Sequence, residues 1–134
     1  MASVPSVLLV EDSDTDARIV QHAINYCDNF DVDFHVEQDF LGAKEWLQGA
    51  RADLVLLDLG LPDASGMEAL KGLLKICPDA PIVILTGFDD MELGLLAIQL
   101  GAEDYLPKSQ LNAENLERII RHSIARFQSR SERK

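Results

Sequence analysis

The sequence has little of what disulfide-stapled, membrane-spanning or secreted proteins need. It contains only two cysteines, Cys27 and Cys77, and neither has a neighbour at metal-motif spacing, so we expect free thiols and no disulfide framework. No apolar run approaches the roughly 20 residues that a membrane-spanning helix requires. The first residues lack the basic start and the long apolar segment of a signal peptide. These absences favour a cytoplasmic protein without membrane insertion.

Basic residues are also scarce. The 134 residues include 12 lysines and arginines against 23 aspartates and glutamates, which gives a net charge of −11. Half of the basic residues lie after position 117, together with a single acid. The strongly acidic part of the chain before residue 118 disfavours direct binding to nucleic acid or to anionic membranes. We interpret residues 128–134 as a basic helix end and tail, whose cations complement the helix dipole.

Apolar residues make up 47% of the chain, an ordinary globular composition, and short apolar runs alternate with helical patterns. Ser13 and Asp16, three residues apart, resemble a helix start. The expected strands lie at residues 7–10, 32–36, 54–57, 81–85 and 105–106, and the expected helices at 13–27, 40–49, 67–76, 90–100 and 112–128. This alternation predicts an α/β fold, a parallel sheet with helices on both faces. We expect one domain over residues 1–134, with its core at about 6–127.

Polar side chains stand at the ends of these strands. Glu11 and Asp12 follow the first strand, and Asp58 ends the third. Thr86 and Lys108 follow the fourth and the fifth. Because ligands of doubly wound sheets bind at the carboxyl ends of the strands, these side chains are predicted to converge on one small cleft. Three carboxylates need a neutralising cation such as Mg²⁺ or Mn²⁺, and a carboxylate beside such an ion, a lysine and a hydroxyl can accept a phosphoryl group.

With these motifs the chain resembles the receiver domain of bacterial two-component response regulators. The matching segments are VLLVED (7–12), DLVLLD (53–58), LP (61–62) with SG (65–66), ILTG (84–87) and GAEDYLPK (101–108). The resemblance covers about residues 6–127. It implies a flavodoxin-like (βα)₅ fold with a five-stranded sheet in the order 2-1-3-4-5. It also implies a phosphorelay signalling domain that catalyses at most its own phosphorylation and dephosphorylation.

The resemblance further implies a phosphoacceptor and a metal site. Asp58 is expected to accept a phosphoryl group from a histidine kinase or a histidine phosphotransfer protein. Mg²⁺ or Mn²⁺ is expected to bind directly to Asp12, Asp58 and the backbone carbonyl of Gly60. Glu11 has a longer side chain and is expected to bind the ion through a water molecule.

Three other residues are expected to respond to the phosphoryl group. The resemblance implies that Lys108 and Thr86 contact the phosphoryl oxygens and that Tyr105 changes rotamer together with Thr86. This movement would carry the signal to the face formed by the fourth helix, the fifth strand and the fifth helix. One position departs from the family, because Ser109 follows Lys108 where the family usually has a proline after a cis bond.

The path of an attacking water is expected to pass two positions. Gly60 lies two residues after Asp58, and Phe88 lies two residues after Thr86. Gly60 leaves the path open on one side, and Phe88 is expected to cover it on the other. Removal of the Phe88 side chain should therefore speed loss of the phosphoryl group.

The expected helix over residues 90–100 has two apolar stripes. By helical spacing, one stripe should face the sheet and consists of Leu93, Leu96, Ala97 and Leu100. The other consists of Met91, Leu95 and Ile98. The second stripe is either part of a broad buried face or an exposed patch that docks a downstream protein or a second copy of the chain after phosphorylation. Gly94 interrupts this helix and weakens it by about 1 kcal/mol relative to alanine.

Other functions fit the same pattern less well. A Mg²⁺-dependent phosphohydrolase that forms an aspartyl-phosphate commonly has a general acid where Gly60 stands. A nucleotide- or flavin-binding module would not place acidic residues after the first strand, where they repel phosphate. A degenerate receiver that serves only as a docking module would not need Asp58, Thr86 and Lys108. The sequence leaves open whether the chain acts alone or is a fragment of a multidomain regulator or sensor.

Overall fold

The computed structural model describes residues 4–28, 30–87 and 91–132. Strands and helices alternate along the chain, which confirms the predicted α/β pattern. The elements are β1 (Ser6–Val10), α1 (Asp14–Asn25), β2 (Asp33–Glu37), α2 (Phe40–Gly49), β3 (Leu54–Asp58), α3 (Gly66–Ile76), β4 (Ile82–Thr86), α4 (Met91–Leu100), β5 (Asp104–Pro107), the 3₁₀ turn η1 (Lys108–Gln110) and α5 (Ala113–Glu132). The largest difference from the expected boundaries is at α5, which continues four residues beyond the predicted end.

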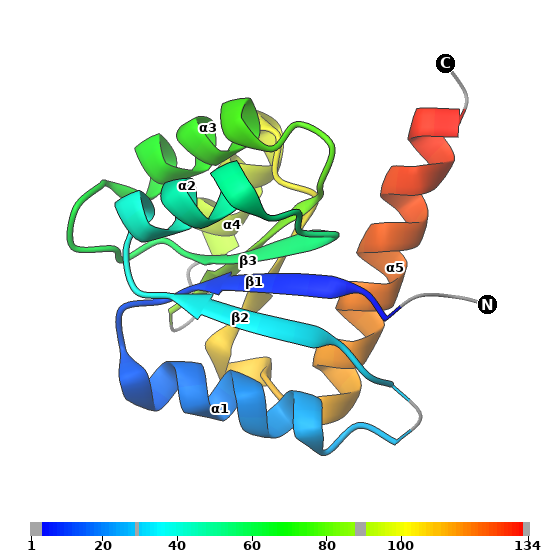
Figure 1. The fold of residues 1–134 in the computed structure, drawn as a ribbon. Helices are drawn as coiled ribbons and strands as arrows, with labels where there is room; N and C mark the ends of the chain where they lie inside the picture. Colours follow the sequence, from blue (N-terminus) through cyan, green and yellow to red (C-terminus); the bar gives the residue numbers. More distant parts are fainter. Residues whose placement is uncertain (1–3, 29, 88–90, 133–134) are drawn as a thin grey trace.

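The five strands form one parallel sheet in the order β2-β1-β3-β4-β5, as predicted (Figure 1). β1 and β3 are neighbours in register, with Val10 beside Leu57. β3 and β4 follow in the same way, with Asp58 beside Leu85. The residues that follow β1 therefore lie next to the end of β3, and the sheet brings the predicted site residues to one edge.

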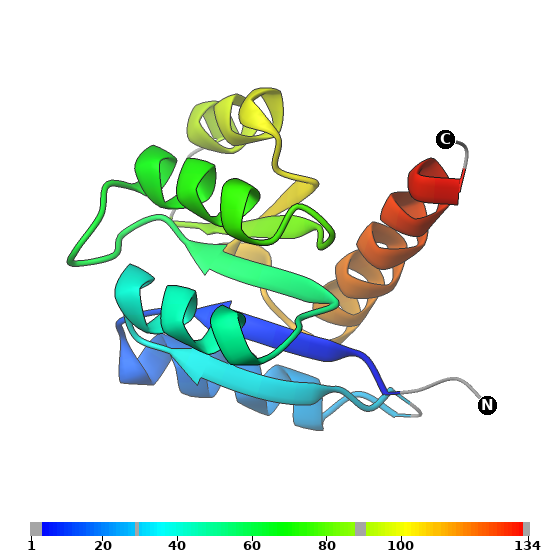
Figure 2. The same ribbon diagram turned by 45° about the horizontal axis from the view of Figure 1, so that its top comes forward.

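Helices cover both faces of the sheet (Figure 2). α1 and α5 cover one face, where Val20 and Ile120 pack against the side chains of β1, β3 and β4. α2, α3 and α4 cover the other, where Ala43 and Leu70 contribute to a second buried cluster. Because β1, β3 and β4 are buried on both faces, their sequences are continuously apolar, whereas the edge strand β2 alternates.

Local side-chain contacts fix several helix boundaries. The hydroxyl of Ser13 accepts a hydrogen bond from the Asp16 backbone N–H at 3.2 Å and caps α1. Asp39 caps α2 in the same way, through the Gly42 N–H at 2.7 Å. Gly101, with φ of 125°, follows α4 in a conformation that residues with a Cβ avoid. Among the described helices, none combines the length and the apolar character needed to cross a membrane.

The face that α4 turns to the sheet differs in part from the predicted one. Ala97 is buried as predicted, together with Gly94, whereas Leu96 and Leu100, which were also expected to face the sheet, are exposed. The reason is that small residues let the helix axis approach β5, so the long leucines lie outside the contact. As a result α4 exposes a wide apolar surface, here called the α4 patch, formed by Met91, Leu95, Leu96, Ile98 and Leu100.

Candidate functional site

Three carboxylates meet at the ends of β1 and β3. Glu11, Asp12 and Asp58 each offer one oxygen, and these oxygens all lie within 4.8 Å of one another. Glu11 is held by its backbone, because its N–H donates to the Glu37 carbonyl at 2.9 Å and so continues the pairing of β1 with β2. Asp58 is the last residue of β3. The structure thus brings together the three acidic residues that the sequence singled out.

Glu11 is the buried member of this cluster, with 1% of its surface exposed. Burial and the neighbouring carboxylate of Asp58 raise the pKa of Glu11 to about 7, although the Lys108 ammonium acts in the opposite direction. Asp12 is exposed. The cluster is therefore short of positive charge even with the lysine in place, a setting that suits a bound cation.

Lys108 reaches the cluster from the end of β5. Its Nζ lies 2.8 Å from Oε1 of Glu11, 2.8 Å from Oδ2 of Asp16 and 3.4 Å from Oδ1 of Asp58. Partial burial lowers the pKa of Lys108, but the hydrogen bonds to Asp16 and Glu11 outweigh this and raise it above its ordinary value. The lysine is a fixed positive charge beside Asp58.

Asp16 is a site residue that sequence reasoning missed. Its spacing from Ser13 was interpreted as a helix-start motif, which accounts for an acidic residue in the first turn without any role in the cleft. A signal was nevertheless present, because that turn follows directly on Glu11 and Asp12. The first turn of α1 therefore had to lie near the same edge of the sheet.

Thr86 and Tyr105 lie on the neighbouring strands β4 and β5. Thr86 is buried at the end of β4, and its hydroxyl has no hydrogen-bond partner among the described residues. A buried hydroxyl without a partner is unfavourable, so this oxygen is placed to bond an incoming group. Tyr105 is half-buried on β5, and its ring lies against Gly94 of α4.

Three further positions from the sequence argument have different outcomes. Gly60 lies beside the carboxylate of Asp58, because a Cβ built on it would stand 3.6 Å from Oδ2 of that residue. Ser109 lies in η1, and no peptide bond in the described ranges is cis, in keeping with the cost of about 2.5–4 kcal/mol for a cis bond before a residue other than proline. Phe88 lies outside the described residues, so its expected shielding role stays a prediction.

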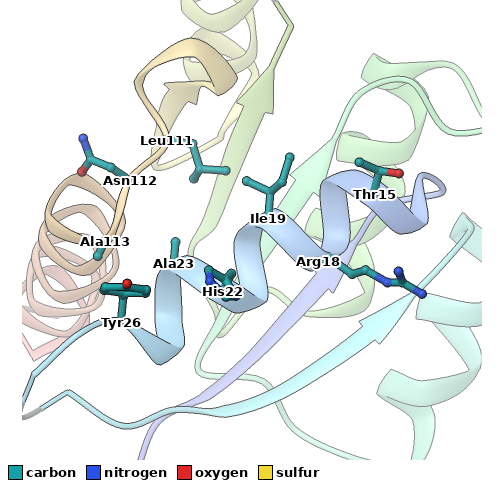
Figure 3. A pocket seen from close by; sticks show the side chains of 9 residues that line it. All are labelled: Thr15, Arg18, Ile19, His22, Ala23, Tyr26, Leu111, Asn112 and Ala113. Atoms are coloured by element: carbon teal, nitrogen blue, oxygen red, sulfur yellow. The ribbon is translucent and has the colours of Figure 1, made fainter.

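A separate groove of about 610 Å³ lies between α1 and the start of α5 (Figure 3). Ile19 of α1 and Tyr26, which follows α1 directly, line it, with Leu111 from the loop before α5. His22 is exposed and also lines the groove. The carboxylate cluster and Lys108 are not part of its lining, so the groove is distinct from the acidic site.

A family model of the response regulator receiver domain matches residues 7–121. The chain belongs to this family. Receiver domains of response regulators act in two-component signalling, and the predicted family and fold are confirmed.

Known receiver-containing proteins are similar over most of the chain. The chain is 31% identical to the regulatory protein LuxO of Vibrio cholerae over 116 residues, which cover 87% of this chain and 25% of LuxO. It is 32% identical to the C4-dicarboxylate transport transcriptional regulatory protein DctD of Rhizobium meliloti, over 81% of this chain and 23% of DctD. This receiver chain thus spans about a quarter of the length of both relatives.

A solved structure agrees with both fold and family. The signal receiver domain of a LuxO repressor protein from Vibrio parahaemolyticus superimposes with a TM-score of 0.83 and 27% identity. The match covers 98% of each chain. The receiver fold is therefore shared along nearly the whole length of this chain.

Proposed function

We propose that this receiver domain accepts a phosphoryl group on Asp58 from a histidine kinase or a histidine phosphotransfer protein. The observation that carries the proposal is the position of Asp58. Its carboxylate stands at the end of β3, within 4.8 Å of two further carboxylates and 3.4 Å from the Lys108 ammonium. The family match supports the same role, because receiver domains take phosphoryl groups from histidine kinases.

The transfer is an in-line displacement. A carboxylate oxygen of Asp58 attacks phosphorus and forms an O–P bond, while the P–N bond to the donor imidazole breaks and its electron pair stays on the nitrogen. Lys108 neutralises charge on the phosphoryl oxygens. The hydroxyl of Thr86 donates to one of these oxygens and thereby gains the partner that it lacks among the described residues.

We propose that the acidic cluster holds Mg²⁺ or Mn²⁺. Asp12, Asp58 and the backbone carbonyl of Gly60 are assigned as direct ligands, and Glu11 as a ligand through water. Three carboxylates within 4.8 Å fit a hard divalent cation. Burial first, and then the neighbouring carboxylate of Asp58, raise the pKa of Glu11. When bound, such an ion supplies additional positive charge for the phosphoryl oxygens.

The same geometry disfavours a hydrolase. A phosphohydrolase of the aspartyl-phosphate type needs a general acid close to its nucleophile, and Gly60 occupies the position where such an acid is commonly found. We therefore assign to this domain only its own phosphorylation and dephosphorylation. A purely degenerate docking module is disfavoured as well, because Asp58, Thr86 and Lys108 are all present at the strand ends.

For the output, we propose that Thr86 and Tyr105 switch together and change the face formed by α4, β5 and α5. The α4 patch offers an exposed apolar surface beside Tyr105 for a downstream protein or a second copy of the chain. We further propose that residues 6–127 form the core of one receiver unit. Output domains such as those of the longer relatives would act through this face.

Mass spectrometry tests the acceptor directly. The full chain, incubated with Mg²⁺ and phosphoramidate, should gain the mass of one phosphoryl group. Asp58→Ala should abolish the gain, whereas Asp79→Ala, a change at an exposed carboxylate, should not. An unmodified wild-type protein that nevertheless binds Mg²⁺ in calorimetry would overturn the proposal.

A further inference from the structure

Asp16 joins two elements that are far apart in sequence. Its carboxylate accepts a hydrogen bond from Lys108 Nζ at 2.8 Å, across 92 positions of the chain. This contact is shorter than the 3.4 Å between Lys108 and Asp58. In the unphosphorylated protein the lysine is therefore closer to a residue outside the acidic cluster than to the acceptor itself.

The orientation of Asp16 is not what the local sequence favours. In a complete capping box the third helical residue would bond back to the N–H of the N-cap, Ser13. Here that N–H is taken by Oε2 of Glu11 at 3.3 Å, and only the other half of the box, from the Asp16 N–H to the Ser13 hydroxyl, is formed. The carboxylate of Asp16 is thus released from its helix and turns to Lys108.

Lys108 has three N–H donors, and two of them have close carboxylate partners in Glu11 and Asp16. To bond phosphoryl oxygens on Asp58, the lysine has to give up part of this pairing. Glu11 is almost fully buried, so leaving its carboxylate without the lysine is unfavourable. Asp16 has 38% of its side chain exposed and can bond water instead. Asp16 is the partner that the lysine can leave at the lower cost.

We propose that Asp16 is a positioning residue that holds Lys108 back from Asp58 in the unphosphorylated protein and competes with the phosphoryl group for the lysine. Phosphorylation then includes an exchange of partners, in which Lys108 leaves Asp16 for the phosphoryl oxygens. The competition raises the barrier to phosphorylation and weakens the phosphorylated state. This inference rests on the proposed role of Asp58 as acceptor.

The test replaces the carboxylate by an amide of the same shape. Asp16→Asn should raise the rate of phosphorylation by phosphoramidate about two- to fivefold, the range expected for a partly exposed ion pair. It should tighten binding of beryllium trifluoride, a phosphoryl analogue, by a similar factor. A purely structural role predicts a slower reaction, so the direction of the change separates the two.

Asp14→Asn is the matched control, because it removes one negative charge from the same turn. Asp14 accepts a hydrogen bond from Gln38 at 3.1 Å. Within the described part of the chain, the hydrogen bonds and ion pairs of Lys108 go to Glu11, Asp16 and Asp58 and not to Asp14. Asp14→Asn should leave both the rate and the affinity near the wild-type values. If Asp16→Asn and Asp14→Asn give the same rates and affinities, the competition is refuted, while phosphorylation of the wild-type protein would still support Asp58 as acceptor.

A measurement without phosphorylation tests the contact itself. A double-mutant cycle compares the urea unfolding midpoints of the wild type, Asp16→Asn, Lys108→Met and the double variant. The fall in the unfolding midpoint of the double variant should be smaller than the sum of the falls of the two single variants, because the second substitution no longer breaks an ion pair. Strictly additive losses would contradict a direct Asp16–Lys108 interaction, whatever the outcome for Asp58.

Discussion

The ring of Tyr105 lies directly against the backbone of Gly94: a Cβ built on Gly94 would come within 2.6 Å of Cγ and Cδ2 of the tyrosine. This contact explains a glycine inside α4, where it weakens the helix by about 1 kcal/mol relative to alanine. The missing side chain makes the space that Tyr105 occupies. The position of the proposed switch residue therefore depends on a neighbouring helix as well as on its own strand.

Gly94→Ala should displace Tyr105 and destabilise the protein. Overpacking of this kind typically costs about 1–3 kcal/mol, which exceeds the gain in helix propensity. Urea unfolding should show a lower midpoint, and Tyr105→Ala in the same chain should recover part of the loss, because it removes the clashing ring. Gly49→Ala is the control, since nothing lies within 4 Å of a Cβ at that position. If the Gly94→Ala protein is as stable as the Gly49→Ala protein, the Tyr105 ring moves aside without a cost in stability.

Removal of metal ligands should separate direct from water-mediated binding. Glu11→Ala should weaken Mg²⁺ binding about tenfold, the usual effect of an outer-shell change, and Asp12→Ala should weaken it more, because Asp12 is assigned the direct contact. Isothermal calorimetry measures both affinities. Asp14→Ala, outside the cluster, should change binding little. Equal losses for Asp12→Ala and Glu11→Ala would contradict the assignment.

A charge in the α4 patch should block the output and leave the chemistry intact. Leu95 is 51% exposed, so Leu95→Glu should fold and become phosphorylated like the wild-type protein. It should abolish any association that light scattering detects only after phosphorylation, because a buried carboxylate at such an interface is unfavourable. Gln99→Glu adds the same charge at an exposed polar position and should have a weaker effect. Unfolding of Leu95→Glu would mean that this residue belongs to the core.

Stability should depend on pH through Glu103. Burial raises the pKa of Glu103, but hydrogen bonds from Arg130 and Arg126 outweigh it and lower the pKa below 4.5. A carboxyl with a lowered pKa stabilises the fold above its unfolded pKa, and this contribution disappears as the pH falls through the folded value. Glu103→Gln should thus lower the free energy of unfolding by about 1–3 kcal/mol at pH 7, and by less as the pH falls through the folded pKa of Glu103.

The control for this effect is Glu114→Gln. Glu114 is 86% exposed, and its pair with Arg118 is 3.5 Å long, so its loss should change stability by less than about 0.5 kcal/mol at either pH. Chemical denaturation at the two pH values compares the variants. A Glu103→Gln effect that is the same at pH 7 and near pH 3 would show that the charge of Glu103 does not contribute.

The sequence alone was sufficient for the sheet and for most of the site. Strands buried on both faces have continuous apolar runs, and polar residues directly after such runs must lie at the carboxyl edge of a parallel sheet. Glu11, Asp12, Asp58 and Lys108 could therefore be placed together without coordinates. The order of the strands came from the resemblance, since local patterns do not encode which strand lies beside which.

Tertiary structure decided the contacts that depend on how helices sit on the sheet. Asp16 has a complete local explanation as a helix-start residue, and only the approach of α1 to the end of β5 gives its carboxylate the Lys108 partner. Likewise, the apolar spacing in α4 correctly predicted that Ala97 is buried, but Leu96 and Leu100 of the same predicted stripe are exposed and Gly94 is buried beside Ala97. Periodicity fixes which residues share a face, whereas packing against a neighbour fixes which face is buried.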